Sequence, residues 1–154
     1  MRLVIQRVSE AGVTIDGHVH ASIGVGFLVL LGIEDEDNEE DISYLIQKLC
    51  NMRIFSDTEG KMNLDIKQIN GEILVVSQFT LHASTKKGNR PSFIKAARPE
   101  KAIPLYERFL SETSLTLGQP CKSGAFGADM KVALINDGPV TIYWIVRIKN
   151  NIYI

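Results

Sequence analysis

The chain has 154 residues and a formal net charge of −1; hydrophobic residues make up 45% and charged residues 23% of it. This length suits one domain with its own core, and the composition is typical of a globular protein. The charge balance excludes binding to nucleic acid through a strong overall positive charge, so any basic contact surface must be local.

No segment indicates a membrane span or a signal peptide. No run approaches the roughly 18 apolar residues that a membrane helix needs, and polar residues interrupt Met1–Val8. We therefore expect a cytoplasmic protein. Cys50 and Cys121 belong to no Cys-x-x-Cys pair, and the chain has no Walker loop or dinucleotide fingerprint. We expect neither a metal nor a cofactor.

The first third of the chain predicts strands and then a helix. Val4–Val8 reads as a strand, and Asp16-Gly17 as the turn of a hairpin, because both turn positions favour positive φ. Gly26–Gly32 is apolar on both faces, which indicates a central strand. Asn38 is placed to cap a helix. The buried face of that helix is expected to hold Ile42, Leu45, Ile46 and Leu49.

A buried strand with a polar end is the most informative feature of the middle of the chain. Ile73–Val76 is four apolar residues, and Ser77, Gln78 and Thr80 follow within four positions. A buried polar group without a partner costs about 1–3 kcal/mol, so a core has no use for three of them together. This strand end therefore lies in solvent or lines a pocket.

The rest of the chain predicts one more helix and further strands. Arg53–Phe55 reads as a short strand, and Ala102, Leu105, Tyr106 and Phe109 mark the buried face of the helix. Either Pro99 or Pro104 suits the first turn of this helix. Two strands, Lys131–Ile135 and Val140–Val146, are expected on either side of a turn. The whole chain is thus predicted to be one α+β domain.

The histidines offer two candidate sites, and the simpler interpretation is favoured for both. His18 and His20 share a strand face, but no third ligand is near in sequence, so an exposed polar face is the better reading. His82 follows Thr80 by two residues, which would allow a nucleophile–base pair if the strand continued. No acidic residue is obviously placed to orient His82, and this pair is therefore not favoured.

Two loops combine residues that suit a nucleic-acid ligand. The first, Ala83–Pro91, holds Lys86, Lys87 and Arg90, which could bind phosphates, and Phe93 follows it as a core or stacking residue. The second, Ser123–Met130, is rich in small residues that let a ligand approach the backbone closely. Each loop is equally compatible with an ordinary surface loop that binds nothing.

Six stretches together resemble the D-aminoacyl-tRNA deacylases of bacteria and eukaryotes. They lie in order and span nearly the whole chain: Ile5–Val8, Gly60–Leu64, Ser77–Leu81, Arg90–Phe93, Phe126–Met130 and Asn136–Thr141. The pairing of Ser-Gln-Phe-Thr with a downstream Asn-Asp-Gly-Pro-Val-Thr is a specific combination.

The resemblance implies a homodimeric hydrolase with a small β-barrel-like domain over residues 1–154, mostly antiparallel strands and two or three flanking helices. It implies hydrolysis of the ester between tRNA and a D-amino acid or a mischarged glycine. It places Ser77, Gln78, Phe79 and Thr80 at the active-site strand end, and Phe126, Ala128 and Met130 among the substrate-binding residues. Gly138 and Pro139 match a cis-proline motif that enters the partner subunit's pocket, and Arg7 braces it. Lys86, Lys87 and Arg90 are then the expected tRNA contacts.

The implied selection of D-amino acids works by exclusion. Rigid carbonyls of a Gly-Pro turn would bind near the substrate ammonium and occupy the space that an L side chain needs. Glycine has no side chain to exclude. The implied catalysis is assisted by RNA: the ribose 2′-hydroxyl helps to activate water, while Thr80 is either a nucleophile or a positioning group.

Three features depart from the family pattern. Position 84 is Ser rather than an acidic residue, His82 has no counterpart in the pattern, and the tail at 147–154 is longer than usual. Two other functions stay open from the residues alone. One is a non-catalytic nucleic-acid-binding dimer that uses Lys86–Arg90, and the other is a general small-ester hydrolase whose pH profile His82 would set.

Overall fold

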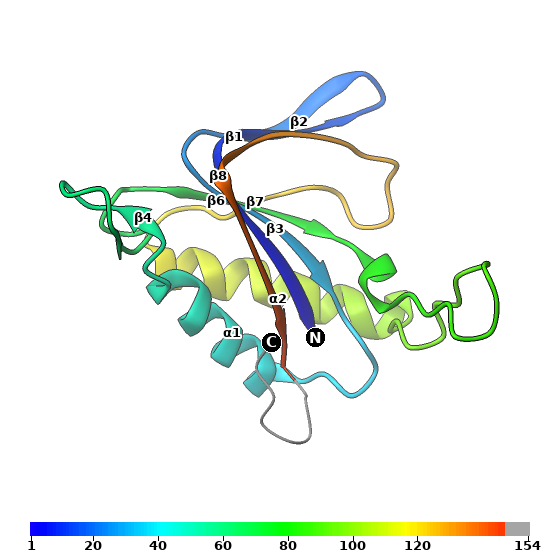
Figure 1. Ribbon diagram of the computed structural model, residues 1–154. Coiled ribbons are helices and arrows are strands. Elements are labelled where there is room, and N and C mark those ends of the chain that lie inside the picture. Colours follow the sequence, from blue (N-terminus) through cyan, green and yellow to red (C-terminus); the bar gives the residue numbers. More distant parts are fainter. Residues whose placement is uncertain (147–154) are drawn as a thin grey trace.

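A strongly curved sheet forms the centre of the computed structural model, which describes residues 1–146 (Figure 1). Its spatial order is β2-β1-β3-β6-β7, and β8 pairs with the free side of β1. The strands of this sheet are β1 (Arg2–Ile15), β2 (His18–Ile23), β3 (Gly26–Gly32), β6 (Glu72–Ser77), β7 (Lys122–Ser123) and β8 (Lys131–Ile145). The α-helices α1 (Glu39–Asn51) and α2 (Pro99–Leu117) lie together on one side of it.

The strand pairs of the described residues are mostly antiparallel, as expected. Strand β1 is antiparallel to β2, β3 and β8. The pairs β3–β6 and β6–β7 are parallel, which the sequence did not predict. A separate antiparallel pair joins β4 (Phe55–Ser56) to β5 (Met62–Leu64). The expected strand at Arg53–Phe55 is therefore wrong in its position, because pairing with β5 begins only at Phe55.

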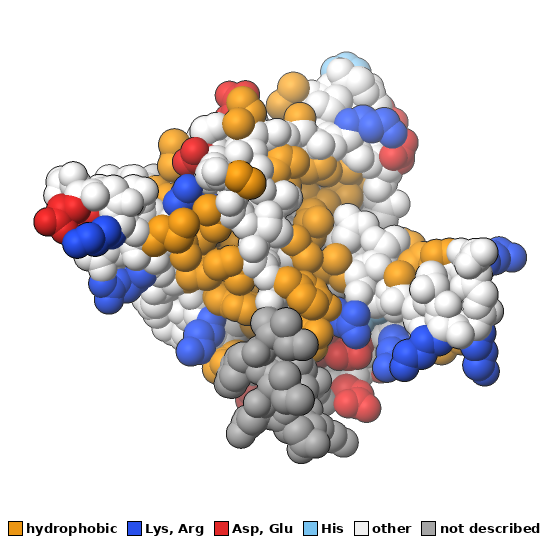
Figure 2. Space-filling model, viewed as in Figure 1, with side chains coloured by type: hydrophobic (Ala, Val, Ile, Leu, Met, Phe, Trp, Pro, Cys, Tyr) orange, Lys and Arg blue, Asp and Glu red, His pale blue; other side chains and the backbone are white. Residues whose placement is uncertain are grey.

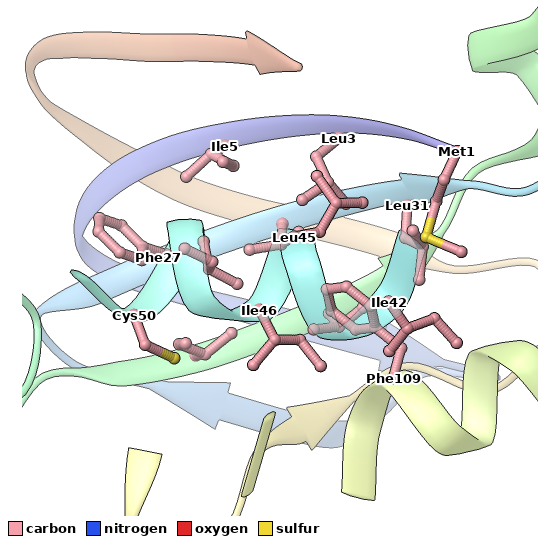
Figure 3. Packing of buried hydrophobic residues seen from close by; sticks show 14 of the residues in the cluster. Met1, Leu3, Ile5, Phe27, Leu31, Ile42, Leu45, Ile46, Cys50 and Phe109 are labelled. Atoms are coloured by element: carbon pink, nitrogen blue, oxygen red, sulfur yellow. The ribbon is translucent and has the colours of Figure 1, made fainter. Parts of the chain in front are cut away.

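Two clusters of buried apolar residues pack against the two faces of the sheet. Along β3 and β6 the side chains alternate between them, so Phe27, Val29, Ile73 and Val75 face the helices while Leu28 and Leu74 face the opposite side. This burial on both faces confirms the central-strand interpretation of Gly26–Gly32. Figure 3 shows the cluster between the sheet and the helices, where Leu45 and Ile46 of α1 meet Phe109 of α2.

The helix boundaries follow from their capping residues. The Asn38 side chain accepts hydrogen bonds from the N–H groups of Glu40 and Asp41, and the Asp41 carboxylate accepts from the Asn38 N–H, which completes a capping box. The predicted cap is thus confirmed. Helix α2 begins at Pro99, so Pro104 lies inside the helix, one turn beyond its start. The first helical position tolerates proline because its N–H would have no partner within the helix.

Strand β8 has a different shape from the one expected. It runs as one strand along β1, in which Gln6 pairs with Thr141 and Val8 pairs with Asn136. The residues between, 137–140, therefore stand opposite Arg7 alone and form a bulge of four residues. The sequence predicted a turn between two separate strands at this place. The turn is instead a bulge within one strand, because both parts of β8 pair with β1.

The remaining expectations concern a hairpin turn, membrane spans and the C-terminal tail. The Asp16-Gly17 hairpin is confirmed: both residues have positive φ, and Ile15 pairs with His18 across the turn. In residues 1–146 neither α-helix is long and apolar enough to span a membrane. The extended tail at 147–154 lies outside the described residues.

Candidate active site

The polar end of β6 turns away from the sheet instead of continuing it. After Ser77 the chain enters a single 3-10 turn, η1 (Phe79–His82). The Gln78 N–H donates to the Leu31 carbonyl at 2.8 Å, and the Leu81 N–H donates back to the Gln78 carbonyl at 3.2 Å. These bonds fix η1 to the end of β3, so its residues extend from a rigid support.

Within η1, the side chains of Thr80 and His82 lie in different environments. Thr80 is exposed, whereas the His82 side chain is completely buried. The nucleophile–base pair, which the sequence did not favour, is therefore not formed, because a 3-10 turn rotates neighbouring residues instead of alternating them. The Thr80 hydroxyl accepts a hydrogen bond from the Gln78 side-chain amide, which leaves its own proton free to be donated.

An acidic residue does lie near His82, although it is distant in sequence. The Glu34 carboxylate comes within 3.9 Å of His82 Nδ1. Burial lowers the pKa of His82 most strongly, and the charge of Arg2 lowers it further, while the Gly32 backbone and Glu34 oppose the change. The ring is thus held in its uncharged form at neutral pH, on the side of η1 away from Thr80.

The basic loop, Ala83–Pro91, follows η1 and projects from the molecule. Figure 2 shows its Lys and Arg side chains on the lobe at the right of the view. Lys86, Lys87 and Arg90 are all exposed. Paired backbone bonds of 2.9 Å between Ser84 and Ser92 close the base of this loop, so it does not depend on an acidic side chain at position 84.

An aromatic pair connects η1 to the segment that follows the basic loop. The Phe79 and Phe93 rings meet edge to face with 5.1 Å between their centroids. Phe79 remains 57% exposed, so one face of its ring is available to a ligand. Together with the polar residues at the end of β6, the pair offers a ligand both apolar and hydrogen-bonding groups.

The loop of small residues, Ser123–Met130, starts next to β6. The Gly124 N–H donates to the Val75 carbonyl at 3.0 Å, two residues before Ser77. Phe126 packs against the Tyr106 ring of α2, with 5.7 Å between the ring centroids. Tyr106 also donates its hydroxyl to the Val75 carbonyl. Phe126, Ala128 and Met130 are half-buried, as residues lining a pocket wall would be.

The bulge of β8 carries Gly138 and Pro139, both exposed, with a cis peptide bond between them. The largely buried Arg7 braces the bulge: its Nε donates to the Asp137 carbonyl at 2.9 Å, and its Nη1 donates to the Ile54 carbonyl. The side chain of Asn136 spans the base of the bulge, accepting from the Val140 N–H and donating to the Thr141 hydroxyl.

The sheet register separates the bulge from η1. Ser77 pairs with Leu31, which pairs with Leu3 of β1. Arg7, which faces the bulge, lies four residues further along β1. At about 3.3 Å per residue the two features are about 13 Å apart along the strands, before the separation across the sheet is added. The bulge therefore lies outside the site on η1 of its own chain.

The remaining candidates do not form a site within residues 1–146. His18 and His20 are exposed, which agrees with a polar strand face. Burial raises the pKa of Cys50 to about 11 and that of Cys121 to about 12. Both thiols therefore stay protonated at neutral pH and are poor nucleophiles.

A family model described as D-Tyr-tRNA(Tyr) deacylase matches residues 4–145 of the chain. A D-aminoacyl-tRNA deacylase of Porphyromonas gingivalis is 64% identical over 142 residues, which cover 92% of this chain and 95% of that protein. The protein of the same name from Flavobacterium psychrophilum is 61% identical over 150 residues, 97% of this chain and 99% of that protein. The chain belongs to the D-aminoacyl-tRNA deacylase family. It is accordingly a hydrolase of ester bonds.

Solved structures agree with this fold. One, described as the c-Myc DNA Unwinding Element Binding Protein, has a TM-score of 0.89 at 41% identity and covers 94% of this chain and 98% of its own. Another, described as a probable eukaryotic D-amino acid tRNA deacylase, has a TM-score of 0.79 and covers 93% and 97%. At 18% identity, the second supports the deacylase fold alone.

Four residues with structural roles around the site were missed by sequence reasoning. They are Arg2, Glu34, Tyr106 in its contact with Phe126, and Asn136. No local pattern marks the first three, because each meets its partner through a long-range contact. Asn136 lies within a matched stretch, and an Asn before an exposed Gly-Pro turn could have suggested a side chain that bonds the turn backbone.

Proposed function

We propose that this deacylase removes D-amino acids, and mischarged glycine, from tRNA, and that it rejects L-aminoacyl-tRNA. The observation that carries the proposal is η1. It presents an exposed Thr80 hydroxyl on a turn that is bonded to the end of the central strand β3, within the Ser77–Leu81 stretch that matches the family. We place the enzyme in the cytoplasm, where translation supplies its substrates.

The chemistry that suits this arrangement is hydrolysis with water as the nucleophile. Water attacks the ester carbonyl carbon, the bond to the ribose 3′-oxygen breaks, and that oxygen takes a proton. The N–H groups of Phe79 and Thr80 open a 3-10 turn and have no carbonyl within the turn to bind, so they can donate to the developing oxyanion. The ribose 2′-hydroxyl of the substrate then helps to activate water, because His82 is buried on the other side of the turn.

Selection against L-amino acids belongs to Gly138 and Pro139 in this proposal. Their bulge is exposed and held by Arg7 and Asn136, so it can reach into another molecule without losing its shape. The register keeps it about 13 Å or more from the η1 of its own chain. The turn therefore acts in the partner's pocket, where its carbonyls meet the substrate ammonium and exclude an L side chain.

A homodimer through β8 provides that geometry. One edge of β8 pairs with β1, and none of its 15 residues is fully buried. Figure 2 shows hydrophobic side chains gathered over the face on which β8 runs. Ile135 is 54% exposed and Tyr143 is 43% exposed on this strand. A second copy would cover both the apolar side chains and the edge of β8 that pairs with no strand of residues 1–146.

The tRNA contacts would come from the basic loop. Lys86, Lys87 and Arg90 are exposed on the loop that follows η1 in the chain, where phosphates of the acceptor end would pass. The exposed Phe79 ring, supported by Phe93, is placed to meet the terminal nucleotide.

A nucleic-acid-binding dimer without catalysis is the second candidate function. It is favoured by the exposed basic loop, and by the likeness to a protein whose name describes binding to a DNA unwinding element. The exposed Thr80 hydroxyl has no role in this alternative. A general small-ester hydrolase, the third possibility, would cleave esters that carry no RNA.

Hydrolysis of D-tyrosyl-tRNA compared with L-tyrosyl-tRNA, with a control lacking enzyme, tests these functions. Rapid loss of the D-ester alone supports the proposal. Equal loss of both esters supports a general hydrolase and contradicts exclusion by Gly138-Pro139. Loss of neither by a folded dimer, combined with salt-dependent binding of tRNA, supports the binding protein.

A further inference from the structure

A buried polar cluster lies directly beneath η1, on the side away from Thr80. Its centre is His82. The side chain has no exposed surface, and neither ring nitrogen has a partner with hydrogen-bond geometry among the described residues. Burial favours the uncharged imidazole, because the charged ring would lose its hydration and the Gly32 backbone and Glu34 compensate for that loss only in part.

Charged groups from two elements face this ring. Arg2 lies on β1 beside Met1, whose amine contacts the carboxylates of Asp37 and Glu34. Glu34 follows β3 and is the carboxylate that approaches His82 Nδ1, at 3.9 Å. The amine of Met1 shares this carboxylate, so Glu34 is only a partial counter-ion for a protonated ring. Arg2 and the Met1 amine oppose protonation, and Glu34 favours it.

The ring is mechanically connected to Thr80 through the short turn. A Cβ atom on Gly32 would lie 3.1 Å from His82 Cδ2 and 3.0 Å from the Leu81 Cβ, which shows how closely η1 rests on the end of β3. Arg2 Nη1 donates to the Leu81 carbonyl at 2.7 Å. The Ala83 N–H donates to the Thr80 carbonyl at 3.0 Å. These contacts pack the ring and the backbone that carries Thr80 against the same end of β3.

We infer that His82 is a positioning residue of the deacylation site: its ring holds η1 against Gly32 and so sets where Thr80 meets the ester. The inference rests on the proposed function, which places Thr80 at the substrate. A proton added to the ring puts a charge into a site without solvent, next to Arg2. Turn η1 then leaves Gly32, and the rate of the chemical step falls. Binding of tRNA by the basic loop is unaffected.

The pH profile of kcat tests this role. In the wild-type dimer we expect kcat for D-tyrosyl-tRNA to fall below pH 6.5, about tenfold for each pH unit once the ring titrates, while KM stays constant. His82→Leu should lose this dependence between pH 7.5 and pH 4.5 and should have a lower kcat at pH 7.5. His20→Leu, which changes an exposed histidine, should keep the wild-type profile.

Two further variants test the direction of the effect. Glu34→Gln removes the carboxylate that favours the charged ring, so the fall in kcat should move to lower pH. His82→Gln keeps a polar side chain that does not titrate, and it should share the flat profile if His82→Leu does not fold. A fall in kcat that persists at the same pH in both His82 variants would overturn the inference.

A measurement without turnover separates this inference from the proposed function. In proton–nitrogen correlation spectra of the full-length dimer, the Thr80 amide should shift with the same midpoint as the His82 ring. If the two signals titrate independently while turnover is normal, the positioning role is overturned. If they titrate together but no aminoacyl-tRNA is cleaved at any pH, the deacylase function fails and the coupling across η1 stands.

Discussion

At the scale of single residues, Thr80 and His82 are two positions apart, yet η1 places one in solvent and the other in the core. This separation decides the chemistry that Thr80 can support. A threonine hydroxyl needs a base to act as a nucleophile. The side-chain contact of Thr80 is with the Gln78 amide, which donates to its oxygen and cannot remove its proton. Thr80 is thus suited to hold a substrate group.

Replacing Thr80 by alanine tests this assignment. We expect kcat for D-tyrosyl-tRNA to fall by about a hundredfold, the usual loss for one preorganised donor, and residual turnover to stay above the uncatalysed rate. Single-turnover kinetics will measure both rates. Thr58→Ala, in an exposed turn, is the matched control. Complete loss of turnover in a folded Thr80→Ala variant would instead identify Thr80 as the nucleophile.

Gly32 is the second residue on which the site depends, although it carries no side chain. In Gly32→Ala the new methyl group would lie 3.0 Å from the Leu81 Cβ and 3.1 Å from the Gln78 carbonyl oxygen. We expect η1 to be displaced, kcat to fall, and stability to fall by about 1–3 kcal/mol, as is usual for overpacking.

The matched control for Gly32 is Gly24→Ala. A methyl group on Gly24 meets one side-chain atom, Glu72 Oε2, at an ordinary 3.7 Å. Steady-state kinetics and urea unfolding of both variants will separate a local displacement from a general loss of structure. Equal kcat values in the two variants would contradict the support that we assign to Gly32.

At the scale of elements, the sequence predicts strand interiors and helix starts better than strand ends. Alternation is not needed to predict β3 and β6, because their central residues, Phe27–Leu31 and Ile73–Val76, are all apolar and face both clusters. The α1 cap is local, since Asn38 and Asp41 bond to each other's backbone within three residues. The path after Ser77 depends on the Leu31 carbonyl, which is more than forty residues earlier in the chain. No local pattern contains that partner.

The same reasoning explains which parts of the site were predicted. Ser77–Thr80 and the basic loop are contiguous in sequence, and their polarity marked them. The approach of Glu34 to His82 depends on how β3 leads into α1. The bulge opposite Arg7 depends on the register in which β8 pairs with β1. The sequence of β8 alone does not determine that register. Contacts between residues distant in sequence therefore set the positions of the groups on which the chemistry depends.

The basic loop gives a prediction at the element scale. Replacing Lys86, Lys87 and Arg90 together by Gln should raise KM for D-aminoacyl-tRNA and leave kcat nearly unchanged, because the loop contacts phosphates and not the ester. Each lost contact to single-stranded RNA should reduce the slope of log binding constant against log salt by about 0.7. Filter binding over a range of salt concentrations measures this slope.

Lys61→Gln is the control for the loop variant. Lys61 is exposed, pairs with Glu59 and directly precedes β5, which is paired with β4 and not with the sheet that carries η1. It should keep the wild-type KM and salt slope. An unchanged salt slope in the loop variant would place the tRNA contacts elsewhere.

At the scale of the whole molecule, His82 links folding to pH. Its pKa is lowered by burial, so below pH 6.5 the unfolded chain binds a proton at this position more readily than the folded chain. The contribution of His82 to stability is therefore complete above pH 6.5 and decreases as the pH falls below that value. Carboxylates such as Glu72, whose pKa is lowered by Lys122, titrate at lower pH still.

Urea unfolding between pH 7.5 and pH 5 tests this linkage. The midpoint of the wild-type protein should decrease across this range, and that of His82→Leu should decrease less. His20→Leu should follow the wild type. Parallel decreases in wild type and His82→Leu would show that other groups cause the acid sensitivity.

The pairing of β1 with β8 has a consequence for how the protein is made. Strand β1 lies at residues 2–15 and pairs along nearly its whole length with residues 131–145. At 5–20 residues per second, on the order of ten seconds separate the synthesis of these two strands. During that interval the first strand emerges from the ribosome with one edge unpaired, and such edges attract other chains. The distance between the partners also raises the contact order, so folding after release is expected to be slower than for a protein of local contacts. Among the described residues, the last strand to be translated is thus the one that covers the free edge of β1.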